Sequence, residues 1–229
     1  MKYNIFLVDA DDTLLDFSAC CKEALKGAMA LCNIPYEEGD EEKYSAINDG
    51  LWKRLERKEI THDDVFRLRF YTFLQDKGWE RESEKLNERY VDRLSASCEK
   101  IAGAEDFLTE LKSMGRVFIV TNGTARVQRG RFKLFGMERF VEGVFISEEL
   151  GAYKPAKEFL QAVEKRIDGF DKERALIIGD GLTSDILLGN NAGVDTLWLN
   201  FRKKENASAA RPTYEAETYQ KALKIIRSV

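Results

Sequence analysis

The sequence predicts an α/β protein in which helices cover a parallel sheet and a separate helical domain is inserted into it. Two observations lead to this prediction. Short apolar runs alternate with helical patterns over residues 116–200, and the long segment between the first two apolar runs has a helical pattern throughout. A third observation concerns chemistry, because the first apolar run, residues 5–8, ends directly in the acidic segment Asp-Ala-Asp-Asp-Thr, residues 9–13.

Five apolar runs are typical of buried strands, because they are short and rich in β-branched and aromatic residues. Helical patterns over residues 124–136, 155–167 and 184–193 separate the last four runs. Pro155 is expected at the first helical position of the second of these helices. This alternation predicts a Rossmann-like parallel sheet with helices on both faces. The expected strands cover residues 4–8, 116–121, 143–147, 175–179 and 196–200.

The segment between the first and second strands predicts a domain of its own. Thr61 followed by Asp64 resembles a capping box at the start of one of its helices. An all-helical insertion between two core strands should form a small four-helix bundle. We therefore divide the chain into an α/β core, residues 1–15 and 99–229, and a helical cap, residues 16–98, which can cover the acidic segment as a lid. The four expected helices lie near residues 17–33, 40–58, 62–77 and 82–98.

Composition excludes several classes of function. The chain has 229 residues and a net charge of -4, and neither core nor cap is basic enough for a nucleic-acid polymer. No stretch approaches the length of a membrane span, and the N-terminus lacks a signal-peptide pattern. We therefore expect a cytoplasmic protein without a membrane partner, either a monomer or a weak dimer. The densest basic stretch is interpreted as a solvated helix face; it contains Arg126, Arg129, Arg131 and Lys133.

Polar side chains follow four of the expected strands. In an open parallel sheet the carboxyl ends of the strands meet at one edge, and ligands bind there. We therefore expect these side chains to converge on one site. They are Asp9, Asp11 and Asp12 after the first strand, Thr121 and Asn122 at the end of the second, Lys154 beyond the third, and Asp180 and Asp185 after the fourth; the backbone amides near Gly123 lie at the end of the second strand as well.

This set of residue types favours a magnesium-assisted reaction of a phosphate. Clustered carboxylates are hard oxygen ligands that suit Mg²⁺, which typically bridges carboxylates to a phosphate. Lys154, Thr121 and the backbone amides near Gly123 suit phosphoryl oxygens. The single histidine, His62, lies in the insertion, so a histidine-based triad or a zinc site has almost nothing to build on.

Four ordered motifs resemble those of the haloacid dehalogenase superfamily of aspartate-dependent phosphotransferases. They are DADDT at 9–13, TNG at 121–123, the Lys154-Pro155 pair, and GDGLTSD at 179–185. The resemblance covers the whole core and implies that Asp9 is the nucleophile that forms an aspartyl-phosphate. It implies that Asp11 protonates the leaving oxygen and then activates water.

The same resemblance implies a cofactor and its ligands. Mg²⁺ would be held by the carboxylate of Asp9, the backbone carbonyl of Asp11 and the side chain of Asp180. Asp185 would support this site, either through a water-mediated contact or by orienting Lys154; as an alternative from the residues alone, Asp185 caps the following helix. The transferring phosphoryl group would be bound by Thr121, Asn122, Gly123 and Lys154.

A second resemblance, to a group of pyrimidine 5′-nucleotidases that clear nucleoside monophosphates, implies the substrate. The matching stretches are DADDTLLDF at 9–17, INDGLW at 47–52, ISEELGAYKP at 146–155, and SDILLGNNAG at 184–193 followed by TLWLN. The implied substrate is a pyrimidine ribo- or deoxyribonucleoside monophosphate. Phe17 and Trp52 are candidates for contacts with the base, with core packing as the alternative for each.

Other functions stay open. The acidic residue at position 11 disfavours dehalogenases and phosphonate hydrolases of this superfamily, which lack it. A sugar-phosphate phosphatase or a phosphomutase would use the same core. A non-catalytic phosphate or nucleotide sensor is the alternative outside enzymes, although a pure binder has no need of a nucleophile.

Overall fold

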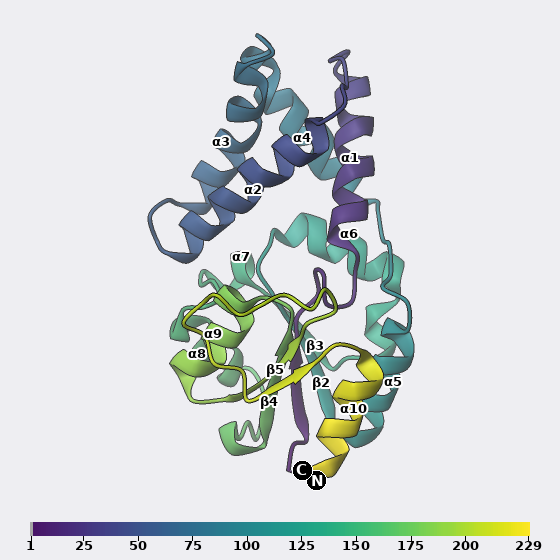
Figure 1. The fold of residues 1–229 in the computed structure, drawn as a ribbon, viewed down its shortest axis with the longest axis vertical. Helices are drawn as coiled ribbons and strands as arrows, with labels where there is room; N and C mark the ends of the chain where they lie inside the picture. Colours follow the sequence, from purple (N-terminus) through teal and green to yellow (C-terminus); the bar gives the residue numbers. More distant parts are fainter. Residues whose placement is uncertain (1) are drawn as a thin grey trace.

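The computed structural model describes residues 2–229 and contains a six-stranded parallel sheet with the strand order β3-β2-β1-β4-β5-β6 (Figure 1). The predicted fold class is confirmed. The sixth strand was not predicted, because its three residues, Tyr-Glu-Ala, contain no apolar run. The strands are β1 Ile5–Val8, β2 Arg116–Thr121, β3 Gly143–Ile146, β4 Ala175–Gly179, β5 Asp195–Leu199 and β6 Tyr214–Ala216.

Strand β1 lies at the centre of the sheet and is buried along its whole length. It pairs in parallel with β2 on one side and β4 on the other. The chain runs outward from β1 through β2 to β3, and then returns to build β4, β5 and β6 on the opposite side. The acidic segment after β1 therefore lies at the point where the strand order reverses, which is the usual ligand site of such sheets.

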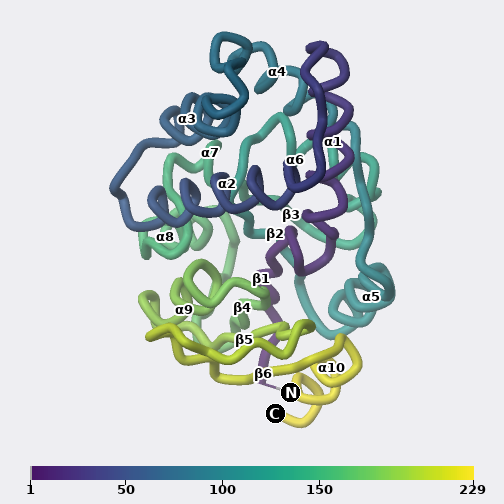
Figure 2. Tube along the Cα trace, turned by 45° about the horizontal axis from the view of Figure 1, so that its top comes forward, coloured from purple at the N-terminus to yellow at the C-terminus, as the bar shows by residue number. Residues whose placement is uncertain are grey.

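Helices cover both faces of the sheet, as predicted. Alternate strand residues point to opposite faces, so Phe6 and Val8 pack with α5 and α10, whereas Ile5 and Leu7 pack with α8. Lys2 and Val229 lie side by side at the end of the core far from the helical insertion, and the amide of Lys2 donates to the carbonyl of Val229 at 2.9 Å (Figures 1 and 2). The core helices are α5 Ala104–Met114, α6 Ala125–Phe135, α7 Ser147–Leu150, α8 Lys157–Glu164, α9 Leu187–Ala192 and α10 Tyr219–Ser228.

The predicted start of helix α8 is wrong. The helix begins at Lys157 rather than at Pro155, because Ala156 has an extended backbone with φ -65° and ψ 133°. The backbone just before this helix is anchored to the residue that follows β2, because the amide and the carbonyl of Lys154 both bond to the side chain of Asn122.

Four long helices between β1 and β2 lie together beyond the carboxyl edge of the sheet (Figures 1 and 2). Their shared apolar cluster includes Tyr44 and Phe70, whose rings stack with centroids 4.8 Å apart. The expected capping box is present at the start of α3, with Thr61 and Asp64 bonded reciprocally. The helices are α1 Phe17–Leu31, α2 Asp40–Glu56, α3 His62–Gln75 and α4 Ser83–Ser95.

Within residues 2–229, no helix has both the length and the apolar character needed to cross a membrane.

Candidate active site

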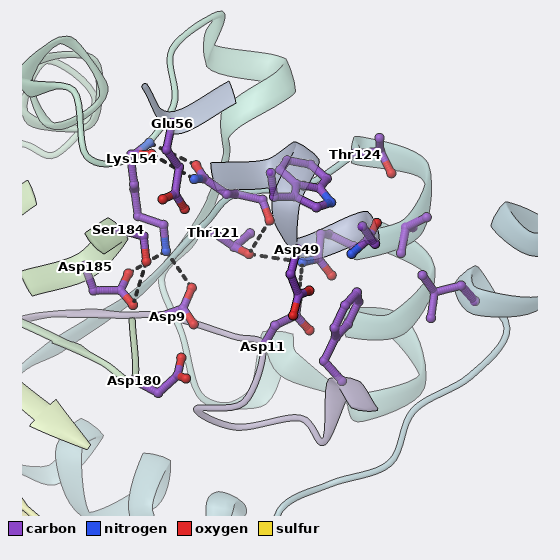
Figure 3. Close-up of a pocket in the computed structure, with 18 of the residues that line it drawn as sticks. Asp9, Asp11, Asp49, Glu56, Thr121, Thr124, Lys154, Asp180, Ser184 and Asp185 are labelled. Carbon is purple, nitrogen blue, oxygen red and sulfur yellow. Dashed lines mark hydrogen bonds and ion pairs between the residues drawn. The ribbon is translucent and has the colours of Figure 1, made fainter. Parts of the chain in front are cut away.

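A cavity of about 270 Å³ lies between the carboxyl edge of the sheet and the helices α1–α4 (Figure 3). Asp12, which the sequence also predicts at this edge, does not line the cavity, but every other residue predicted at the site does. From the core these are Asp9, Asp11, Thr121, Asn122, Gly123, Lys154, Asp180 and Asp185, and from the helical insertion they are Phe17 and Trp52.

Lys154 is the centre of the charge network on the core side. Its side chain is only 2% exposed, and its Nζ lies 2.6 Å from Asp9 Oδ1 and 2.6 Å from Asp185 Oδ1. The same Nζ donates to the carbonyl of Val120 at 3.0 Å. Burial alone lowers the pKa of Lys154, but the charges of Asp185 and Asp9 outweigh it and raise the pKa. The lysine therefore stays positively charged between two carboxylates.

Asn122 and Gly123 have partners within the protein. The Asn122 side chain donates to the carbonyl of Lys154 and accepts from its amide, both at 2.9 Å. The amide of Gly123 donates to Ser147 Oγ at 3.0 Å. In this structure the Asn122 side chain fixes the backbone that carries Lys154.

Three carboxylates form a cluster that fits a divalent cation. Asp9, Asp180 and Asp185 each offer an oxygen, and these oxygens lie within 4.8 Å of one another. Burial and the charge of Asp185 raise the pKa of Asp9 well above its usual range, although Lys154 opposes this. Burial and the charge of Asp185 also raise the pKa of Asp180 to about 7. Hard oxygen donors that repel one another suit Mg²⁺, whose charge relieves that repulsion.

Asp185 is held on both oxygens, which favours the interpretation that it orients Lys154. Its Oδ1 pairs with Lys154, and its Oδ2 accepts from the amide of Gly181 at 3.1 Å. It lies inside a π-helical turn, Leu182–Ile186, so the alternative that it caps a helix is wrong. A Cβ at Gly179 would come within 2.3 Å of Asp185 Oδ2, so only glycine lets the carboxylate approach the strand this closely.

The side chain of Asp11 bonds to helix α6, and sequence reasoning missed both of its partners. Gln128 Nε2 donates to Asp11 Oδ2 at 2.8 Å, and Arg131 Nη1 donates to Asp11 Oδ1. The interpretation of the basic stretch as a solvated face is wrong for Arg131, whose side chain is completely buried. Helical spacing was an available signal, because Arg131 lies four residues after Val127 and four before Phe135, on the buried face of α6.

The remaining basic residues of this stretch behave as expected. Arg126 pairs with Asp92 and Arg129 pairs with Glu149 at half-exposed positions, and Lys133 is exposed.

The wall that the helical insertion contributes to the cavity combines aromatic rings with polar groups. Phe66 of α3 lines the cavity, and the guanidinium of Arg69 lies 4.3 Å from the centre of its ring. Arg69 is 4% exposed and donates through Nε to Asn87 at 2.8 Å. Its Nη2 has no hydrogen-bond partner among the residues that the structure describes. Arg69 is a further site candidate that sequence reasoning missed.

Two carboxylates of α2, Asp49 and Glu56, face the same cavity (Figure 3). Glu56 accepts a hydrogen bond from Thr183 of the core at 3.1 Å, and burial raises its pKa.

Comparisons with known proteins identify the family. Residues 3–193 match the haloacid dehalogenase-like hydrolases, so the chain belongs to this family. The predicted enzyme class, a hydrolase of phosphoric monoesters, is confirmed.

Individual relatives resemble the chain over nearly its whole length. The pyrimidine 5′-nucleotidase PynA of Streptococcus pneumoniae is 37% identical over 97% of this chain and 94% of its own. The pyrimidine 5′-nucleotidase YjjG of Escherichia coli is 29% identical over 93% of both chains.

YfnB of Bacillus subtilis, described as a HAD-hydrolase, is 37% identical over 98% of this chain and 96% of its own. Its crystal structure, bound to magnesium, superimposes with a TM-score of 0.93 over 99% of both chains.

Proposed function

We propose that the protein is a Mg²⁺-dependent 5′-nucleotidase that hydrolyses pyrimidine nucleoside monophosphates, deoxy forms included, through a phosphoryl group carried on Asp9. The observation that carries the proposal is the buried arrangement of Lys154 between Asp9 and Asp185, at the bottom of a cavity roofed by aromatic side chains. A carboxylate attacks an anionic phosphate only where positive charge reduces their repulsion.

Each core residue has a role in this reaction. An oxygen of Asp9 attacks the phosphorus, and the bond from phosphorus to the nucleoside oxygen breaks while Asp11 gives that oxygen a proton. Asp11 then takes a proton from water as the water oxygen attacks phosphorus, and the bond from phosphorus to Asp9 breaks. Lys154 and Thr121 bind the phosphoryl oxygens, with the backbone amide of Asn122 as a further candidate; the amide of Gly123 already donates to Ser147.

The acidic cluster is the proposed metal site. Asp9 and Asp180 would bind Mg²⁺ directly, together with the backbone carbonyl of Asp11, and Asp185 would hold Lys154 beside it. When bound, the cation would supply positive charge against the phosphate and the Asp9 carboxylate. The carboxylate oxygens of Asp9, Asp180 and Asp185 lie close enough together to hold the cation. The magnesium-bound structure of YfnB supports this proposed metal site.

The proposed cap, residues 16–98, would select the substrate. Phe17, Trp52 and Phe66 present aromatic rings to the cavity, and a base can stack against such rings. The Nη2 of Arg69 is a donor without a partner within residues 2–229, which suits a carbonyl oxygen of a pyrimidine. The relatives PynA and YjjG are named pyrimidine 5′-nucleotidases, which supports a pyrimidine nucleotide as the proposed substrate.

The charges on α2 favour one phosphate over two or three. Asp49 and Glu56 face the cavity from the proposed cap, and a second phosphate group would meet their negative charge. The composition of the insertion supports the same preference, because residues 16–98 carry 14 basic and 18 acidic side chains.

A turnover screen tests the proposal. Purified protein with Mg²⁺ is assayed against pyrimidine and purine nucleoside monophosphates, the deoxy forms, and a panel of sugar phosphates, with Asp9→Asn as the inactive control. We expect the highest kcat/KM for a pyrimidine nucleoside monophosphate. A sugar phosphate with kcat/KM tenfold above every nucleotide would replace the proposal with the sugar-phosphatase alternative, and an isomerised product would indicate a mutase.

A further inference from the structure

Arg131 is a fully buried arginine whose one ion pair within residues 2–229 is with Asp11. Removing a guanidinium from water is costly, and a buried charge persists only where a partner compensates it. Its Nε and Nη2 have no hydrogen-bond partner in the part of the chain that the structure describes. An arginine side chain has five N–H donors. In Arg131 the hydrogen bonds go to the carboxylate of Asp11 and to Gln128, which itself donates to that carboxylate.

Gln128 completes a clamp on the same carboxylate. It lies one helical turn before Arg131 and donates to Asp11 Oδ2, while Arg131 donates to Oδ1. The two clamp residues also bond to each other, since Arg131 Nη1 donates to Gln128 Oε1 at 3.1 Å. Both carboxylate oxygens therefore have a fixed donor, and the donors fix each other.

The clamp also reaches the phosphate side of the site. Gln128 Nε2 donates to Thr121 Oγ1 at 3.0 Å as well as to Asp11. The ring of Phe17, at the start of α1, lies 5.4 Å from the Arg131 guanidinium. Two residues of α6, Gln128 and Arg131, thus link Asp11 to Thr121, and Arg131 lies against the ring of Phe17, the first residue of α1.

We propose that Arg131 and Gln128 are positioning residues that act on the reaction through Asp11. This rests on the proposed function, in which Asp11 protonates the leaving oxygen. Gln128 sets the direction of the carboxylate relative to Thr121. Arg131 stabilises the carboxylate that remains after the proton has passed to the nucleoside oxygen, which keeps the electron pair of the broken phosphorus–oxygen bond. The same carboxylate then accepts the proton of the attacking water.

Two substrates with different leaving groups distinguish a positioning role of Arg131 and Gln128 from a purely structural one. The parameter kcat/KM reports steps up to departure of the alcohol. Departure of an alkyl alcohol needs a proton, whereas p-nitrophenolate departs without one. General acid catalysis contributes roughly 10²–10⁴-fold, so misplacing the acid should cost a nucleoside monophosphate about tenfold to a hundredfold more than p-nitrophenyl phosphate.

The experiment measures kcat/KM for both substrates in Arg131→Met, Arg131→Lys and Gln128→Met. In Arg131→Met and Gln128→Met we expect kcat/KM to fall more for the nucleotide than for p-nitrophenyl phosphate. In Arg131→Lys, which keeps the positive charge, kcat/KM for the nucleotide should be partly restored. Arg129→Met is the matched control, because Arg129 lies on the half-exposed face of the same helix and pairs with Glu149. It should leave both substrates unchanged. If Arg131→Met does not fold, Gln128→Met gives the same readout.

A double variant separates the inference from the function on which it rests. In an Asp11→Asn background, Arg131→Met should add less than about threefold to either loss, because the group it positions is already absent. Equal losses for both substrates in Arg131→Met, or a full additional loss in the Asp11→Asn background, would make Arg131 purely structural. If Asp11→Asn itself shows no dependence on the leaving group, the proposed role of Asp11 fails instead.

Discussion

Protons should compete with Mg²⁺ for the carboxylate cluster, and Asp180 sets the pH at which they do so. Burial and the neighbouring charge of Asp185 raise the pKa of Asp180 to about 7. Below that pH the carboxyl is protonated in the metal-free protein, so binding of the cation must release a proton. The apparent affinity for Mg²⁺ should therefore fall as the pH is lowered.

The size of the effect follows from the pKa. For one proton displaced from a group with a pKa of about 7, the apparent binding constant is divided by 1 + 10^(pKa − pH), which is about 30 at pH 5.5 and close to 1 at pH 8. We expect the dissociation constant for Mg²⁺ to rise about thirtyfold between these two values, which is about 2 kcal/mol.

The stability of the metal-free protein should change in the same pH range. The pKa of Asp180 is raised on folding, so its contribution to stability is full below the unfolded value of 3.8 and is lost as the pH rises through about 7. Between pH 6 and pH 8 the loss is about 1 kcal/mol of unfolding free energy. Added Mg²⁺ should raise Tm more at pH 8 than at pH 6.

Isothermal titration calorimetry with Mg²⁺, in two buffers of different ionisation enthalpy, measures the affinity and the number of protons released. Asp195→Asn is the control, because Asp195 begins β5 at the opposite end of the sheet and hydrogen bonds from Lys2 and Tyr3 lower its pKa despite burial. It should leave both quantities unchanged. A dissociation constant that changes less than threefold between pH 5.5 and 8, with no proton released, would refute the reasoning.

Three further outcomes follow from the site. Asp9→Asn should abolish turnover without changing the circular dichroism spectrum, and more than about 1% residual kcat would count against Asp9 as the nucleophile. Asp49→Asn should raise kcat/KM for a nucleoside diphosphate relative to the monophosphate severalfold, whereas an unchanged ratio would remove Asp49 from selection. Arg69→Met should raise KM for a pyrimidine nucleotide about tenfold but not for p-nitrophenyl phosphate. The exposed Arg67→Met on the same helix is the control, and equal shifts for both substrates would contradict base recognition.

The sequence was sufficient to predict how the core strands bring the motifs together. Asp9, Thr121 and Asp180 each follow or end a buried apolar run, and parallel strands put such ends at one edge whatever the loops between them do. The convergence of these residues in one cavity depends on this rule alone. Strand β6 could not be predicted in this way, because it forms through its pairing with β5 and its residues contain no apolar run.

The parts of the site that escaped prediction depend on side chains that pair across the fold. The motif of residues 121–123 predicts that Asn122 binds phosphate, yet its side chain bonds to the backbone of Lys154, 32 residues away in the sequence. Arg131 was predicted at the surface because most arginines are exposed; helical spacing could have indicated its burial, but not its partner Asp11, which lies 120 residues away. No local pattern encodes either pair.

The connection between Asp11 and the helical insertion is also short along the chain. Asp12 has a left-handed backbone, with φ 56°, and its side chain accepts a hydrogen bond from the amide of Phe17 at 3.2 Å. Phe17 is the first residue of α1, and its ring lies against the guanidinium that pairs with Asp11. Because the nucleophile candidate, the acid candidate and the first residue of α1 all lie within residues 9–17, a change in the direction of α1 must alter the surroundings of Asp11. The position of the helical insertion and the positioning of the proposed acid are therefore parts of one structural unit.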